Sequence, residues 1–157
     1  MKYQKEDIYL RPLVREDALT SFRWRNDPEV WKYTGSRPDR IITPEIELNW
    51  IEQVLQNTSR RTFAICLAES DQYIGNVQIT NICGTTGEFH IFIGDKSFWG
   101  KGIGTIASEK ILEIAKKELH LSKLNLQVNL KNTAAHKIYS KIGFIAIDDA
   151  GNMEINL

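Results

Sequence analysis

The stretch Trp99-Gly100-Lys101-Gly102-Ile103-Gly104-Thr105 indicates what kind of fold this chain adopts. It stands between a segment with the pattern of a strand, which ends at Ile93, and a helical pattern that begins near Thr105. Three alternate glycines let the backbone approach a ligand closely and aim several N–H groups in one direction. At the start of a helix, these donors add to the positive end of the helix dipole. We therefore expect the loop to bind a phosphate-bearing ligand.

Two common phosphate-binding motifs do not account for this loop. A Walker A loop needs a Gly-Lys-Ser/Thr ending four residues after its first glycine, which this segment lacks. Gly102, Gly104 and Ala107 match the spacing of a dinucleotide fingerprint, G-x-G-x-x-A. That motif needs an acidic residue about 20 residues further on, where this chain has Asn125 and Gln127. The alternative that stays open is a glycine loop that only turns the chain tightly.

The segments around the loop predict a mixed α/β domain. Apolar periodicity and turn residues indicate helices first, then an antiparallel meander, and then a strand–helix–strand–helix–strand order. Strands are expected over 8–13, 63–68, 73–80, 88–93, 124–129, 145–147 and 153–157, and helices over 15–24, from Thr43-Pro44 onward, over 105–119 and over 133–142, the last ending at Gly143.

Length and composition exclude several classes of protein. A chain of 157 residues is expected to form one domain over 1–157. Its 20 basic and 20 acidic residues give no excess of positive charge for holding nucleic acid. No apolar run approaches the roughly 20 residues of a membrane span, and the start has no signal-peptide core. With only Cys66 and Cys83, we expect a cytoplasmic protein without disulfides and with no membrane partner. The oligomeric state stays open, a homodimer included.

The loop and a second segment together resemble a known family. The second segment is Asn132-x-x-Ala135-x-x-x-Tyr139-x-Lys141-x-Gly143-Phe144, and the pair resembles the GNAT superfamily of N-acetyltransferases, in the branch with ribosomal-protein N-terminal, spermidine and amino-sugar enzymes. The family pattern at the loop is Gln/Arg-x-x-Gly-x-Gly/Ala. Gly102 and Gly104 fit it, whereas Trp99 replaces the Gln or Arg. The resemblance covers essentially the whole chain and implies a central, mostly antiparallel twisted sheet of six or seven strands flanked by about four helices.

The resemblance also implies acetyl-CoA as co-substrate and no metal. Its pyrophosphate would be held by backbone N–H groups of the loop, and its pantetheine arm by the strand that ends at Ile93 and by Asn132. The cofactor-binding residues expected on this basis are Ile91, Phe92, Ile93, Trp99, Gly100, Lys101, Gly102, Ile103, Gly104, Thr105, Asn132, Ala135 and Lys141. The three histidines and two cysteines show no metal-ligand spacing.

Acetyl transfer to an amine sets the expected catalytic residues. Alkyl amines have a pKa near ~10, so a base or a water chain must remove a proton before attack. The departing thiolate needs a nearby proton donor, and by resemblance Tyr139 is that general acid. Glu88 and His90 share one face of the strand before the loop. We expect Glu88 as the base and His90 in substrate binding, with His90 or a bridging water as alternative bases.

The acceptor amine is less defined. Trp24-Arg25-Asn26 resembles a segment of amino-sugar acetyltransferases that act on nucleotide-linked sugars, which implies that Trp24 stacks on the acceptor and that Asn26 bonds to it. The alternative is that Trp24 packs in the core and Asn26 only ends a helix. An amino sugar and a peptide N-terminal amine both fit.

Several charged residues are expected to have no role at the site. Arg60-Arg61 is expected as a solvated strand entry, and Arg37 or Arg40 could meet a phosphate of the acceptor only if the loop before the second helix closes. No acidic cluster calls for a polyamine, because Glu45, Glu47 and Glu52 are expected mostly on the outer face of that helix. The functional expectation is an acetyl-CoA-dependent N-acetyltransferase; the alternative is a non-catalytic acyl-CoA sensor or partner-binding module on the same fold.

Overall fold

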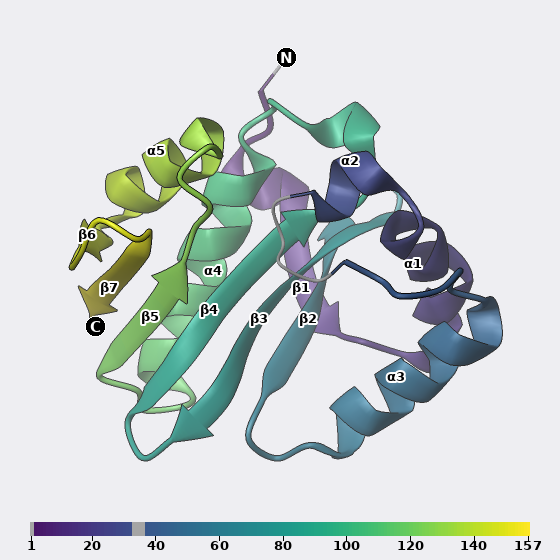
Figure 1. Cartoon of the computed structure of the whole chain (residues 1–157), viewed down its shortest axis with the longest axis horizontal. Helices are drawn as coiled ribbons and strands as arrows, with labels where there is room; N and C mark the ends of the chain where they lie inside the picture. The colour runs from purple at the N-terminus through teal and green to yellow at the C-terminus, as the bar shows by residue number, and fades with distance from the viewer. Residues whose placement is uncertain (1, 33–36) are drawn as a thin grey trace.

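A seven-stranded sheet with the order β1-β2-β3-β4-β5-β7-β6 runs through the molecule (Figure 1). The computed structural model describes residues 2–32 and 37–157. Among these residues, every neighbouring pair of strands is antiparallel except β4 and β5, which are parallel. The expected mostly antiparallel sheet is thus confirmed. The strands are β1 Ile8–Pro12, β2 Arg61–Leu67, β3 Tyr73–Cys83, β4 Thr86–Ile93, β5 Lys123–Gln127, β6 Ile145–Ala146 and β7 Asn152–Asn156.

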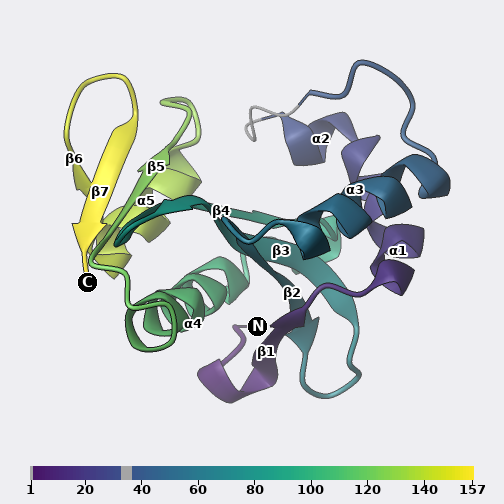
Figure 2. The same ribbon diagram turned by 90° about the horizontal axis from the view of Figure 1, so that it is seen from below.

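Helices cover both faces of the sheet. Figure 2 shows α1, α2 and α3 on one face and α4 on the other. Each face has its own apolar core: the α4 face buries Phe89, Ile111 and Leu124, and the opposite face buries Trp24 and Ile51. The helices are α1 Ala18–Arg25, α2 Pro28–Trp31, α3 Pro44–Gln56, α4 Ile103–Lys117 and α5 Thr133–Ile142, with 3₁₀ turns at Lys5–Asp7, Arg15–Asp17 and Lys96–Phe98.

Local signals place most of the helix ends. The Thr43 hydroxyl accepts from the Ile46 amide at 3.2 Å and caps α3, as the sequence predicts. Helix α5 has its expected bounds and ends at Gly143, whose φ is 124°. Among residues 2–32 and 37–157, no helix is long and apolar enough to cross a bilayer.

Some elements differ from the prediction. Asn26-Asp27-Pro28 ends a helix as expected, but Asp27 also caps a further short helix, α2, by accepting from the Glu29 amide. The first helix begins as a 3₁₀ turn and becomes α-helical at Ala18. The sequence pattern did not predict α2 because four residues are too few to show a helical period.

Candidate active site

A cleft opens where β4 and β5 separate. The two strands pair from Thr86 to Glu88 on β4 and from Lys123 to Asn125 on β5, and beyond this they diverge (Figure 1). A cavity of about 1260 Å³ lies there, bordered by the ends of both strands, the loop before α4, the first turn of α4, and α5. The parallel pairing therefore creates the site by stopping early.

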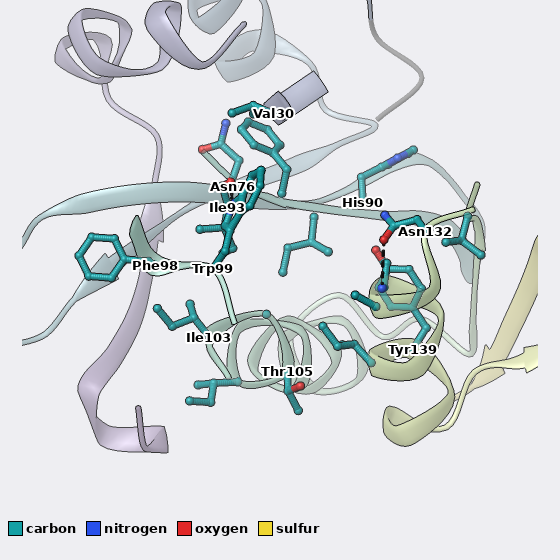
Figure 3. A pocket seen from close by; sticks show the side chains of 18 of the residues that line it. Val30, Asn76, His90, Ile93, Phe98, Trp99, Ile103, Thr105, Asn132 and Tyr139 are labelled. Carbon is teal, nitrogen blue, oxygen red and sulfur yellow. Dashed lines mark hydrogen bonds between the residues drawn. The ribbon is translucent and has the colours of Figure 1, made fainter. Parts of the chain in front are cut away.

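The end of β4 directs backbone groups into this cleft. In an antiparallel pair, alternate residues direct both backbone polar groups to the same neighbouring strand. The Gly94 amide donates to Ile74 on β3 at 2.8 Å, so by alternation the groups of Ile91 and Ile93 face the cleft. The Ile93 carbonyl agrees with this, because it accepts from Trp99 Nε1 at 2.7 Å (Figure 3). Ile91 thus presents an N–H and a carbonyl where an extended amide-bearing ligand would lie.

The glycine loop forms one end of the cleft. Gly100 and Gly102 have φ values of 72° and 85°, a region that favours glycine. Gly102 is the N-cap of α4, so the helix begins at Ile103, two residues earlier than predicted. The N–H groups of Ile103, Gly104 and Thr105 belong to the first turn and have no acceptor within the helix. They are free to bind an anion, and they line the cleft.

The N-terminal segment supports the loop, which the sequence did not predict. Lys2 Nζ donates to the Gly100 carbonyl at 3.1 Å, and the Tyr3 amide donates to the Lys101 carbonyl at 3.0 Å. The sequence carries no signal for this contact between segments almost 100 residues apart. The lysines that line the cleft in this region and on α5 are Lys2, Lys101, Lys137 and Lys141.

Helix α5 provides the wall with Tyr139. The Asn132 side chain caps this helix by accepting from the Ala135 amide at 3.2 Å, and both residues line the cleft together with Tyr139 (Figure 3). The Tyr139 ring packs edge-on against Phe89, with centroids 5.7 Å apart. Burial raises the pKa of Tyr139 to about 12. In the described part of the chain its hydroxyl has no hydrogen-bond partner, so it is a protonated donor open to the cleft.

His90 and Glu88 lie on the same face of β4, but only His90 lines the cleft. His90 Nε2 lies 3.0 Å from Thr80 Oγ1 and 3.7 Å from Glu88 Oε2. The Glu88 carboxylate also accepts from Asn81 Nδ2 at 3.0 Å. Burial lowers the pKa of His90 from its ordinary 6.5; the nearby Arg60 acts in the same direction, and Glu88 opposes it. His90 is therefore neutral at pH 7. Within residues 2–32 and 37–157, no group of three potential metal ligands occurs.

The two expected acceptor residues lie in different places. Trp24 lines the cleft but is only 8% exposed, and its ring packs against Tyr73 at 4.7 Å and Phe92 at 6.0 Å between centroids. Asn26 is not among the lining residues, because its side chain accepts from the Ile42 amide and donates to the Ile42 carbonyl, both at 2.8 Å. The structure does not bring Asn26 into the cleft. Of the loop 35–40, residues 35 and 36 lie outside the described residues.

Glu47 corrects an expectation. It is 1% exposed instead of lying on the outer face of α3, and it accepts from Ser21 Oγ and from Arg25 Nη1, each at 2.6 Å. Helical spacing places Glu47 on the same face as the buried Ile51. A charged residue at that position is buried only because α1 supplies Arg25, and the sequence does not show this partner.

Arg60 is the second correction. It lies directly before β2 and is half-buried, not solvated. Its Nε donates to Thr62 Oγ1 at 3.3 Å, its Nη2 donates to Gln78, and its guanidinium lies 5.6 Å from the centroid of the Trp50 ring. Gln78 and Trp50 both line the cleft. Arg60 is not itself a lining residue, but it contacts two residues that are, at the end of the cleft formed by α3 and the sheet.

The chain matches a family described as an acetyltransferase (GNAT) domain over residues 7–145. It belongs to the GNAT acetyltransferase family. A spermidine N(1)-acetyltransferase of Escherichia coli K12 is 30% identical over 138 residues, which cover 87% of this chain and 72% of that protein. The fold resembles that of a spermidine N-acetyltransferase from Vibrio cholerae in complex with CoA and spermine, with a TM-score of 0.83, 21% identity and 96% of each chain covered. A ribosomal-protein-S5-alanine acetyltransferase from Vibrio fischeri has the same TM-score at 18% identity, with 99% of this chain and 96% of that chain covered.

Membership in this family gives the cleft its chemistry. This GNAT protein is an N-acetyltransferase with acetyl-CoA as co-substrate. The residues present fit that molecule: the first turn of α4 offers free N–H donors to a diphosphate, and the open edge of β4 offers backbone groups to an amide-bearing arm. When bound, acetyl-CoA would supply an activated thioester.

Proposed function

We propose that this GNAT protein transfers the acetyl group directly to the primary amine of a small molecule, such as an amino sugar or a nucleotide-linked amino sugar, or to a peptide N-terminus. The observation that carries the proposal is the position of Tyr139, whose free hydroxyl opens into the cleft beside the diverging end of β4. The loop supports binding of the diphosphate at one end, and His90 supports binding of an amine at the other.

Ligand binding follows from the backbone in this proposal. The N–H groups of Ile103, Gly104 and Thr105 bind the diphosphate, and the nearby lysines neutralise its charge. Ile91 pairs with the pantetheine arm as an added strand would. The Trp99 indole already bonds the Ile93 carbonyl, so that carbonyl pairs with a ligand only if the indole moves.

Tyr139 assists the departure of the thiolate. Its pKa of about 12 keeps the phenol protonated at neutral pH, so it donates a hydrogen bond to the sulfur as negative charge develops there. A phenol with a pKa this high is a weak acid. An ammonium group loses two protons on its way to the amide: the first leaves before attack, and the second reaches the departing thiolate through the phenol or through water.

His90 is the group nearest the acceptor amine in this proposal. It lines the cleft and is neutral at pH 7, so it can accept the amine proton. Glu88 lies beside it, 3.7 Å from Nε2, and acts through His90 or through a water. In this proposal Glu88 still takes part in catalysis, and His90 is the residue that contacts the amine directly.

The test is release of free CoA thiol over a panel of amines that includes sugar nucleotides and peptides. We expect Tyr139→Phe to lower kcat by about 100-fold with little change in CoA affinity. Tyr9→Phe is the matched control, because Tyr9 lies on β1 away from the cleft. Its hydroxyl donates a hydrogen bond to Asp71 at 2.8 Å. Full activity in Tyr139→Phe would remove Tyr139 from the mechanism.

A further inference from the structure

Two arginines gather on one aromatic ring at the acceptor end of the cleft. The guanidinium of Arg25 lies 5.8 Å from the centroid of the Trp50 ring, and that of Arg60 lies 5.6 Å from the same centroid. Arg25 belongs to α1 and Arg60 directly precedes β2, and α3 carries the ring between them. Arg25 and Trp50 line the cleft, and Arg60 lies next to it through its contacts with Trp50 and Gln78. Stacking on an indole orients a guanidinium while leaving its N–H edge available.

Protein contacts leave N–H donors of both arginines unoccupied. Within residues 2–32 and 37–157, no carboxylate lies within 4.0 Å of Arg60, whose hydrogen bonds go to the neutral Gln78 and Thr62. Arg25 donates to Glu47 at 2.6 Å, which uses one of its five N–H donors. A half-buried cation without a counter-charge is costly, so this end of the cleft has a positive charge available for a ligand.

The acidic residues that line the cleft are paired or lie on its other side: Glu109 is on α4, across the sheet from Arg25 and Trp50. Glu47 is buried against Arg25 and Ser21, and Glu29 is paired with Lys96 at 3.1 Å. The carboxylate of Glu88, 43% exposed, lies beside His90. Thr62 on β2 lies opposite Gln78 on β3, which in turn lies opposite His90 on β4, so the three side chains share one face of the sheet. An acceptor with an amine near His90 and an anionic group near Arg60 matches this arrangement, whereas a polyamine does not.

We propose that Arg60 and Arg25, held on the Trp50 ring, bind an anionic group of the acceptor, a phosphate or a carboxylate, and so select an amine that carries negative charge. The inference rests on the proposed function, because it names the class of amine that the same cleft acetylates. Arg60 is the specificity-determining residue, and Glu47 positions Arg25 by bonding its guanidinium. A phosphate and a carboxylate would accept from the same guanidinium N–H donors.

The experiment compares kcat/KM for matched pairs of acceptors, measured by release of CoA thiol. One pair is an amino sugar with and without a phosphate, and the other is a short peptide with a C-terminal carboxylate and the same peptide amidated. Spermidine serves as the polycationic acceptor. We expect the anionic member of one pair to be preferred by about tenfold or more, and which pair shows the preference identifies the source of the anion.

Substitution then assigns the preference to Arg60. We expect Arg60→Gln to remove most of it through a higher KM for the anionic acceptor, with the KM for acetyl-CoA unchanged. Arg61→Gln is the matched control, because it removes the same charge from the exposed neighbouring residue, whose guanidinium bonds only backbone carbonyls among the described residues. If Arg60→Gln keeps the preference, or if spermidine is the better acceptor, the inference is wrong while the proposed function stands.

A binding measurement tests the inference even if none of the acceptors reacts. Titration of inorganic phosphate into the protein saturated with CoA, followed by calorimetry, reports on the acceptor end alone, because CoA blocks the glycine loop. We expect binding that Arg60→Gln weakens and that Arg61→Gln leaves unchanged. If no amine of either class releases thiol, the proposed function fails; if phosphate also fails to bind in an Arg60-dependent way, so does this inference.

Discussion

Gly94 follows β4 and lies directly against the indole of Trp24. A Cβ atom on Gly94 would lie 2.0 Å from Trp24 Cδ2, and Trp24 is too buried to move aside freely. We expect Gly94→Ala to lower the free energy of unfolding by about 1–3 kcal/mol, measured by urea denaturation. A fully stable Gly94→Ala protein would show that Trp24 can shift, and would make Trp24 available to an acceptor.

Gly104 offers the matched control for that substitution. A Cβ atom there would meet only Ile138 Cδ1, at an ordinary 3.5 Å, and Gly104 lies in the first turn of α4. Gly104→Ala is expected to leave stability unchanged or raise it by up to about 1 kcal/mol. Loss of CoA affinity in that stable variant would show that the glycine serves the ligand and not the fold.

His90 makes a prediction about pH. Since burial lowers its pKa from 6.5, its neutral, proton-accepting form predominates at pH 6.5 and above and is lost only as the pH falls through the depressed value. We expect the activity of the wild-type protein relative to His90→Gln to decline below pH 6.5. The ratio of the two rates cancels the titration of the amine itself.

Two outcomes would contradict this assignment. A ratio that stays constant over the whole acid range in which the protein remains folded would exclude His90 as the base. If Glu88→Gln removes the same acid limb while His90→Gln keeps it, the base is Glu88, acting through a water.

At the scale of elements, Asn132 has two separable roles. Its side-chain oxygen caps α5, and the residue lines the cleft where the pantetheine arm is expected. Asn132→Ala is expected to cost about 1 kcal/mol of stability and to weaken CoA binding. Asn132→Asp keeps an oxygen for the cap, so stability should be retained, while the lost N–H donor should raise the KM for acetyl-CoA. An unchanged KM in Asn132→Asp would limit Asn132 to the cap.

The predicted elements differ from the observed ones at identifiable places. The pattern of Ile106, Ala107 and Ile111 predicts α4, but its start at Ile103 depends on Gly102 adopting a left-handed conformation, which the apolar period does not show. The bounds of α5 are correct because Asn132 and Gly143 are both strong end signals. Strand β3 extends to Cys83 instead of Thr80, since its last residues pair with β4 through an irregularity in register.

At the scale of the whole molecule, ligand binding should appear as stability. A ligand that binds only the folded state at 100 times its Kd adds about 2.7 kcal/mol, and about 1 kcal/mol raises the Tm of a chain this long by roughly 2–4 °C. We expect acetyl-CoA to raise the Tm by about 5–10 °C under these conditions. NAD is the control and should give no shift; a shift with NAD equal to that with acetyl-CoA would contradict the specificity of the cleft.

The net charge of the chain does not show where its charged residues lie in the fold. The chain has as many acidic as basic residues, yet Lys2, Lys101, Lys137 and Lys141 all line one cleft. These lysines come from the N-terminus, the loop and α5, and only folding brings them together. A neutral chain can therefore present a locally cationic site to a polyanionic co-substrate.

The sequence by itself determined the fold class, the glycine loop, the bounds of α5 and the place of Tyr139, because these depend on local residue patterns: glycine spacing, helix caps and period. The tertiary structure alone decided that Asn26 lies outside the cleft, that Glu47 is buried and that Arg60 lies on the Trp50 ring at the α3 end of the cleft. The physical reason is that the cost of burying a polar or charged group depends on its partners. Those partners, Ile42, Arg25 and Trp50, come from other segments of the chain.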